Sequence, residues 1–337
     1  MAVSPMCMYS SQDGFANDFH LAHLGSRAAG GFGFIMQEAT AVSPEGRITH
    51  KDLGIWKDDH IPKLKQLVDY CRSHGSLMGI QLAHAGRKAS NRPPYQGRGQ
   101  LNPEHPHGWQ TFSASEIPFK DSEQPPVALD EQGIEKVKQD FIAATKRAKT
   151  IGYDVVEIHA AHGYLLHQFY SPESNKRKDQ YGGSFENRIR LLLEITRLVK
   201  NEWGSEKPLM VRISATDWTE NGWSIEDSIK LSKHLKDLGV DLIDTSAGGN
   251  MTGVRIPLSP GYQVEFAGRI KKEAEISTGA VGLITEAEQA EKILQQQQAD
   301  LIFFGREALR HPYLPIKFAK DLNIKPEWIR QYEWAVG

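Results

Sequence analysis

Short apolar runs alternate with stretches of helical period along almost the whole chain. Each run is rich in β-branched or aromatic residues and is bounded by polar or glycine-containing segments, which is typical of strands in a parallel sheet covered by helices. We count eight such runs: Ala2–Met6, Gly33–Val42, Leu77–Ala85, Tyr153–Ala161, Leu209–Ala215, Val240–Ser246, Ala280–Ile284 and Ala299–Phe304. The pattern predicts repeated β–α units.

The segments between these runs have the apolar spacing of amphipathic helices. Ser184 is placed as the N-cap of one helix, and Glu186 lies in its first turn, where a carboxylate suits the helix dipole. Segments Ile225–Leu238 and Glu286–Leu294 show the same spacing. The apolar stripe that begins after Ser184 consists of Leu191, Leu192, Ile195, Leu198 and Val199.

Eight β–α alternations with right-handed crossovers form either a closed barrel or a long open sheet. An open sheet normally carries a glycine-rich phosphate loop after its first strand. That position here contains Ser4, Pro5, Met6 and Cys7 instead. We therefore predict an α/β fold with a single (β/α)8 TIM barrel over residues 1–337.

One segment breaks this rhythm. Asn91–Pro126 contains seven of the 17 prolines and little helical period. A long irregular segment in a compact domain is either a functional lid or a disordered linker. Because it follows the third predicted strand at the end where barrel enzymes hold their chemistry, we predict a lid loop at 91–126.

Composition argues against several classes of partner. A net charge of −2 gives no electrostatic basis for binding nucleic acid or acidic membranes. No apolar run approaches the roughly 20 residues that span a bilayer, and no signal-peptide pattern opens the chain. Cys7 and Cys71 are too few for a disulfide framework, so we expect a cytoplasmic protein, with Cys71 packed in a helix.

Polar residues cluster at the C-terminal ends of the predicted strands. His159, His162 and Tyr164 follow the fourth strand within six residues. The two imidazoles could donate hydrogen bonds to a ligand oxygen, bind a metal, or be satisfied core histidines. The general-base glutamate of an H-E-x-x-H zinc site is missing, and we predict no metal.

Arg212 interrupts the apolar fifth strand, where a buried charge is costly unless it is paired. Two interpretations remain open. Arg212 forms an internal ion pair, with Glu157 or Glu38 as candidate partners, or it holds a fixed positive charge against an electron-rich ligand.

The ends of the last two strands favour a phosphate. Gly282-Leu283 and Gly305-Arg306 place small residues and a guanidinium at the usual phosphate site of barrels, although structural turns are the alternative. Cys7 is a nucleophile, a thiol against a redox cofactor, or a packed residue. No base adjacent in sequence would lower its pKa.

Several segments resemble the old yellow enzymes, a family of FMN-dependent ene-reductases. The resemblance extends from Ala2 to about Tyr332, and the combination of Cys7 and Tyr9 is similar to the thermophilic-like branch. The segments that carry it are Ser4–Ser10, Gln81–Lys88, His159–Leu165 and Ser171–Arg188.

The resemblance implies non-covalent FMN in the mouth of the barrel, reduced by NADPH or NADH. Arg212 would lie near the flavin N1/C2 carbonyl and stabilise the reduced ring. The other implied flavin contacts are Ser4, Pro5, Met6, Cys7, Ala39 and Gln81 for the ring, and Gly282, Leu283, Gly305 and Arg306 for the phosphate.

The resemblance further implies reduction of the activated C=C bond of α,β-unsaturated carbonyl compounds through flavin N5, with coenzyme and substrate binding in turn. His159 and His162 would donate hydrogen bonds to the substrate carbonyl, and Tyr164 would protonate Cα. Tyr9 would contact the substrate oxygen or the lid. Cys7 would tune the flavin potential.

Two features depart from the family pattern. Members normally have a strand hairpin before the position of Ala2, which leaves open whether Met1 is the native start. Trp334 follows Gln331, Tyr332 and Glu333 where the branch often has an arginine that reaches into the neighbouring subunit. We still expect a homo-oligomer, a dimer or a tetramer.

Three rival interpretations can be separated. An FMN barrel with an iron–sulfur cluster needs four thiolates, and the chain has two cysteines. A metal-dependent barrel hydrolase would be colourless. A flavin-binding protein without turnover would need no proton donor.

Overall fold

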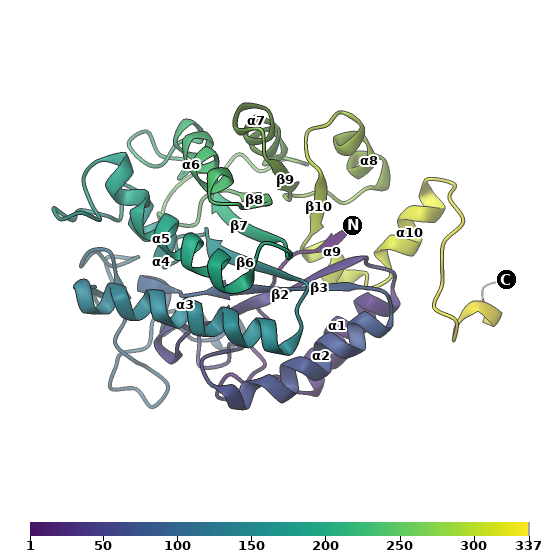
Figure 1. The fold of residues 1–337 in the computed structure, drawn as a ribbon, viewed down its shortest axis with the longest axis horizontal. Coiled ribbons are helices and arrows are strands. Elements are labelled where there is room, and N and C mark those ends of the chain that lie inside the picture. The colour runs from purple at the N-terminus through teal and green to yellow at the C-terminus, as the bar shows by residue number, and fades with distance from the viewer. Residues whose placement is uncertain (336–337) are drawn as a thin grey trace.

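Eight parallel strands close into a barrel in the computed structural model, which describes residues 1–335 (Figure 1). Their order around the barrel is β1-β10-β9-β8-β7-β6-β3-β2, so each strand lies beside its neighbour along the chain. The predicted (β/α)8 barrel is confirmed. The barrel strands are β1 (Ala2–Val3), β2 (Phe34–Ala41), β3 (Leu77–Ala83), β6 (Val155–Ala160), β7 (Leu209–Ser214), β8 (Leu242–Ser246), β9 (Ser277–Ala280) and β10 (Leu301–Phe304).

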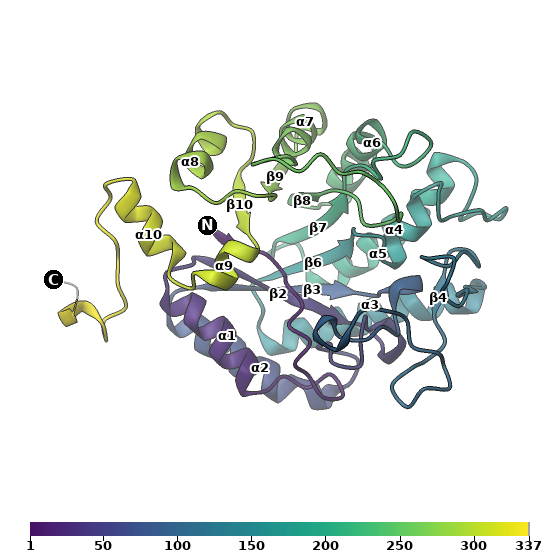
Figure 2. The same cartoon turned by 180° about the vertical axis from the view of Figure 1, so that it is seen from behind.

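Helices surround the barrel on its outside, and the chain after the last of them extends away from it (Figures 1 and 2). The Ser184 side chain accepts a hydrogen bond from the backbone N–H of Asn187, as expected of an N-cap. Cys71 is buried, as predicted. The helices are α1 (Asp18–Ala29), α2 (Ile61–Ser73), α3 (Glu131–Ile151), α4 (Leu165–Tyr170), α5 (Phe185–Trp203), α6 (Ile225–Asp237), α7 (Val264–Ala274), α8 (Ala287–Gln295), α9 (Arg306–Arg310) and α10 (Leu314–Asp321).

Two strands, β1 and β9, have a boundary more than two residues from the prediction. β1 ends at Val3, so the segment from Ser4 onwards is a loop. β9 spans Ser277–Ala280 instead of 280–284, and Gly282 lies after the strand and not on it. The apolar pattern misled because the loop after β9 is apolar, while Gly282 and Leu283 have positive φ angles (122° and 52°) that cannot continue a strand.

Side chains inside the barrel form layers along its axis, because successive residues of a strand alternate between the interior and the helices. The lower layer is apolar and includes Phe34, Met36, Val155, Met210 and Phe303. The middle layer is polar and buried: Gln81, Glu157, Arg212 and Asp244. The upper layer, at the mouth, includes His159, Ser214 and Ser246.

Segment 91–126 is irregular apart from a 3-10 turn at Pro94–Gln96 and the short strand β4 (Phe112–Ser113), which pairs with β5 (Val127–Ala128). Arg87 holds this segment against the loop after β8: its guanidinium donates to the carbonyls of Ile117 (3.3 Å) and Asn250 (2.6 Å). The lid role of 91–126 stays a prediction.

Candidate active site

The predicted site residues lie around the C-terminal ends of the barrel strands, where two cavities open. One cavity, of about 270 Å³, extends from Arg212 to Gly305 and Arg306. The other, of about 390 Å³, is lined by Tyr9, Lys88 and part of segment 91–126. The structure therefore brings together side chains that are far apart in the sequence.

His159 is the penultimate residue of β6, lies on the interior face and is 3% exposed. Its Nδ1 accepts a hydrogen bond from the backbone N–H of Ala161 (3.2 Å), so the neutral ring carries its proton on Nε2. Burial, with Arg212 and Lys88 nearby, lowers the pKa of His159 well below its usual value. The ring is therefore a neutral N–H donor.

His162 has a left-handed backbone (φ 58°), and its N–H donates to Ser214 Oγ (2.9 Å). Its Nε2 lies 2.7 Å from Ser246 Oγ, a closer partner for that hydroxyl than Gln263 Oε1 at 3.4 Å. When the hydroxyl donates to Nε2, the ring carries its proton on Nδ1. Burial and Arg212 lower the pKa of His162 well below its usual value, so this ring is also neutral.

Tyr164 packs edge-on against His159, with ring centroids 4.9 Å apart, while His159 and His162 are 5.3 Å apart. Burial raises the pKa of Tyr164 well above its usual value, so the hydroxyl keeps its proton. Lys88 Nζ lies 5.2 Å from the Tyr164 ring centroid and donates to the carbonyls of His162 (2.8 Å) and Gly249 (2.7 Å). No role for Lys88 is predicted from the sequence.

Cys7 and Tyr9 follow β1 and border the same region. Burial raises the pKa of the Cys7 thiol well above its usual value, and Asp52 and Glu38 add to the effect. A thiolate nucleophile is therefore disfavoured. Burial also raises the pKa of Tyr9, whose carbonyl accepts a hydrogen bond from the Tyr95 hydroxyl (2.7 Å).

Ala39 and Gln81 are direct cross-strand partners, because a register shift in β2 pairs them. Gln81 Nε2 donates to Glu157 Oε1 (2.7 Å). Arg212 forms its ion pair with Asp244 (Nε to Oδ2, 3.2 Å), its register partner on β8. The suggested glutamate partners were wrong, since the acid facing Arg212 comes from a strand not considered.

The phosphate end of the smaller cavity fits FMN. Arg306 forms no side-chain hydrogen bond or ion pair within residues 1–335, so its guanidinium is available to an anion. A Cβ at Gly282 would lie 2.8 Å from Gln263 Nε2, so the backbone approaches closely only because this residue is glycine. Met6 Sδ lies 3.7 Å from the Cβ position of Gly305, which places Met6 beside the end of β10.

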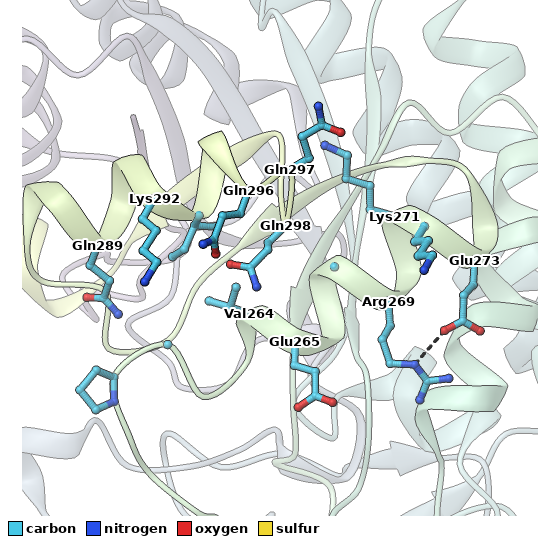
Figure 3. Close-up of a pocket in the computed structure, with 15 residues that line it drawn as sticks. Val264, Glu265, Arg269, Lys271, Glu273, Gln289, Lys292, Gln296, Gln297 and Gln298 are labelled. Carbon is cyan, nitrogen blue, oxygen red and sulfur yellow. Dashed lines mark hydrogen bonds and ion pairs between the residues drawn. The ribbon is translucent and has the colours of Figure 1, made fainter.

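Two other features, one buried and one on the surface, lie outside this site. His84 Nδ1 accepts from the N–H of Gly86 (3.0 Å), and His84 lines neither cavity. A hollow of about 920 Å³ lies between α7 and α8, lined by charged and glutamine side chains such as Lys292, Gln298 and Arg269 (Figure 3). It contains none of the predicted site residues.

Residues 1–335 include no group of three or more His, Cys, Asp or Glu side chains placed to hold a metal ion. Among the described helices, none is both long and apolar enough to cross a lipid bilayer.

Comparison with known proteins agrees with this geometry. Residues 1–325 match the model of the NADH:flavin oxidoreductase / NADH oxidase family. A protein of Listeria innocua named NADPH dehydrogenase is 49% identical over 337 residues, covering 99% of this chain and 94% of the relative.

Solved structures with the same fold include the old yellow enzyme homologue from Zymomonas mobilis, with a TM-score of 0.79 and 26% identity over 98% of this chain and 91% of that one. Morphinone reductase has a TM-score of 0.80 and 26% identity over 96% of this chain and 86% of that one. The protein therefore belongs to the NADH:flavin oxidoreductase / NADH oxidase family, as an FMN-dependent oxidoreductase of the old yellow enzyme type.

Proposed function

We propose that the protein reduces the activated C=C bond of α,β-unsaturated carbonyl compounds, with NAD(P)H as the source of electrons. The observation that carries this proposal is the grouping of two neutral imidazoles and one protonated phenol at the mouth of the barrel, beside a cavity lined by Arg212 and Arg306. FMN, when bound beside these residues, would supply the hydride-transfer chemistry, with NAD(P)H as its reductant.

His159 and His162 act on the substrate carbonyl oxygen. Negative charge grows on that oxygen as hydride reaches Cβ, and two preorganised N–H donors stabilise it. His159 donates from Nε2, because its Nδ1 accepts from Ala161. His162 donates from Nδ1 when its Nε2 accepts from Ser246. Neither ring has to lose a proton first, since both are neutral.

Tyr164 delivers the proton to Cα. Its pKa lies well above 10, so the hydroxyl is protonated at neutral pH, and its ring is held between His159 and Lys88. A phenol with a raised pKa releases its proton only to a strong base, and the carbon of an enolate is one. The hydroxyl therefore contributes to the step that completes C=C reduction.

Coenzyme and substrate use the same opening in turn. The larger cavity beside Tyr9 and Lys88 carries Arg92 and Arg98, which form no side-chain ion pair in the described part of the chain. These cations suit the phosphates of a nicotinamide dinucleotide. Segment 91–126 supplies them, which supports its role as a lid. A homo-oligomer also remains part of the proposal.

The test is the visible spectrum of the purified protein under anaerobic conditions. We expect a yellow protein that NADPH bleaches and that cyclohexenone restores. A colourless protein with bound metal would point to a hydrolase, and a yellow protein that NADPH fails to bleach would point to a flavin carrier. Bleaching without recovery on adding the enone would remove the proposed substrate class.

A further inference from the structure

A polar tetrad lies inside the barrel below the mouth. It consists of Gln81, Glu157, Asp244 and Arg212, one from each of β3, β6, β8 and β7, and none is more than 5% exposed. Gln81 donates to Glu157 (2.7 Å), and Arg212 lies against Asp244 (3.2 Å). Apolar side chains such as Met210 close the barrel below it.

The two acids in the centre of the tetrad require a proton. Glu157 Oε2 and both carboxylate oxygens of Asp244 are buried without a donor among the described residues. Both acids are fully buried in the barrel interior, and the charge of Asp244 acts on Glu157. Like charges buried this close to each other disfavour ionisation of both acids, which favours a proton on one of them.

The neighbours decide which acid holds the proton. Burial raises the pKa of Asp244 as well, but the facing Arg212 guanidinium opposes that shift and favours the charged form. Glu157 faces a neutral amide, and burial together with the charge of Asp244 raises its pKa well above its usual value. Glu157 is therefore the protonated acid and Asp244 the carboxylate, and the tetrad carries no net charge.

We propose that protonated Glu157 and ionised Asp244 are positioning residues that orient Gln81 and Arg212 toward the flavin pyrimidine ring and set the flavin reduction potential. Gln81 uses its N–H on Glu157, which leaves its carbonyl to accept from a ring N–H. Arg212 is held by its ion pair with Asp244, and its side chain lines the FMN cavity. Asp244 offsets part of the positive charge that would otherwise stabilise a reduced, anionic ring. This inference rests on the proposed cofactor site.

Two substitutions separate the roles of the acids. Glu157→Gln replaces a neutral acid by a neutral amide that can still accept from Gln81 and donate to Asp244. We expect the ratio of reduced to oxidised flavin at a fixed potential to stay within about twofold of wild type. Asp244→Asn removes the negative charge beside Arg212, so the ratio should shift toward reduced flavin by roughly tenfold or more.

The measurement is a dye-equilibrated anaerobic titration of the holoenzyme, followed by its visible spectrum. Asp154→Asn is the matched control, because Asp154 precedes β6 at the other end of the barrel and accepts from the N–H of Met78 (2.9 Å). An unchanged potential in Asp244→Asn, or an equal shift in Glu157→Gln, would overturn the proposal.

The pH dependence of the free energy of unfolding gives a second measurement. It requires only the Glu157→Gln variant, so it can be made even if Asp244→Asn does not fold. In the wild type the folded protein keeps a proton on Glu157 that the unfolded chain releases above pH ~4.3, so stability falls as pH rises above that value. The unfolding equilibrium constant of the wild type, divided by that of Glu157→Gln, should therefore increase with pH. Between about pH 6 and 8 the increase should reach at most about tenfold for each pH unit. Parallel pH curves, measured by denaturation with excess FMN, would refute the proton on Glu157.

Neither measurement depends on enone turnover. An active ene-reductase with parallel pH curves would remove this inference alone. A protein that binds FMN and shows both effects, but fails to reduce cyclohexenone, would remove only the proposed substrate.

Discussion

Tyr164→Phe tests the assignment of the proton donor most directly. The phenylalanine ring can keep the edge-on packing against His159 at 4.9 Å and the contact with Lys88 at 5.2 Å. The Tyr164 hydroxyl has no hydrogen-bond partner within residues 1–335, so its removal breaks no internal contact. We expect a folded, FMN-bound variant whose stability is close to wild type.

The two half-reactions should respond differently. Loss of a general acid slows the step that uses it by about 10²- to 10⁴-fold, so oxidation of the reduced enzyme by an enone should slow by that factor. Reduction by NADPH, which needs no proton at carbon, should be unchanged. Anaerobic stopped-flow absorbance follows each half-reaction separately.

A matched substitution distinguishes chemistry from packing. The Tyr170 hydroxyl donates to the Ala160 carbonyl (2.8 Å), so Tyr170→Phe should lower stability and leave both half-reactions near wild type. Ferricyanide, which needs no carbon protonation, should oxidise reduced Tyr164→Phe at the wild-type rate. Equal slowing of both half-reactions in Tyr164→Phe would refute the proton-donor role.

Four further predictions follow from the same geometry. His159→Ala should slow enone reduction by roughly 10²-fold, the cost of one lost oxyanion donor, and unchanged turnover would exclude the residue from the mechanism. Arg306→Ala should weaken FMN binding by about 10- to 100-fold in a fluorescence titration, because a charge-assisted hydrogen bond to phosphate is lost, whereas an unchanged affinity would place the phosphate elsewhere. The raised pKa of Cys7 predicts slow alkylation by iodoacetamide at pH 8, measured by mass spectrometry, and rapid labelling of the native protein would contradict it. Burial lowers the pKa of Lys88 to about 7, so the unfolded chain binds the Lys88 proton more strongly than the folded chain does. The stability of the wild type should therefore rise relative to that of Lys88→Met between about pH 7 and 10, and chemical denaturation that shows no such rise would disprove the prediction.

The alternation of apolar runs and amphipathic stretches was sufficient to predict eight β–α units, because the apolar period of a segment is set by its own secondary structure. The choice of a closed barrel over an open sheet needed a second observation, the missing glycine-rich loop after the first strand. The apolar pattern was misleading at β9. Val281 and Ile284 extend the apolar run past the strand, yet the positive φ of Gly282 and Leu283 ends it. Backbone conformation at such a turn depends on the neighbours that pack over it.

The types of side chain at the strand ends were predicted from the sequence. The sequence also identified Arg212 as an unusual charge within an apolar strand. Its partner Asp244 was not predicted, because that pairing depends on the register between β7 and β8. Lys88 was missed for a similar reason. Its role comes from two carbonyls, of His162 and Gly249, that approach it only in the closed barrel.

The sequence by itself determined the order of the elements, the residue types at the mouth and the small residues that follow the last two strands, since these follow from local spacing and composition. Tertiary structure alone decided which groups meet and how they are charged. Ser246 contacts His162 across 84 positions of chain, and Glu157 and Asp244, from β6 and β8, are buried together only in the closed barrel. Ionisation depends on desolvation and neighbouring charge, and both are properties of the folded chain.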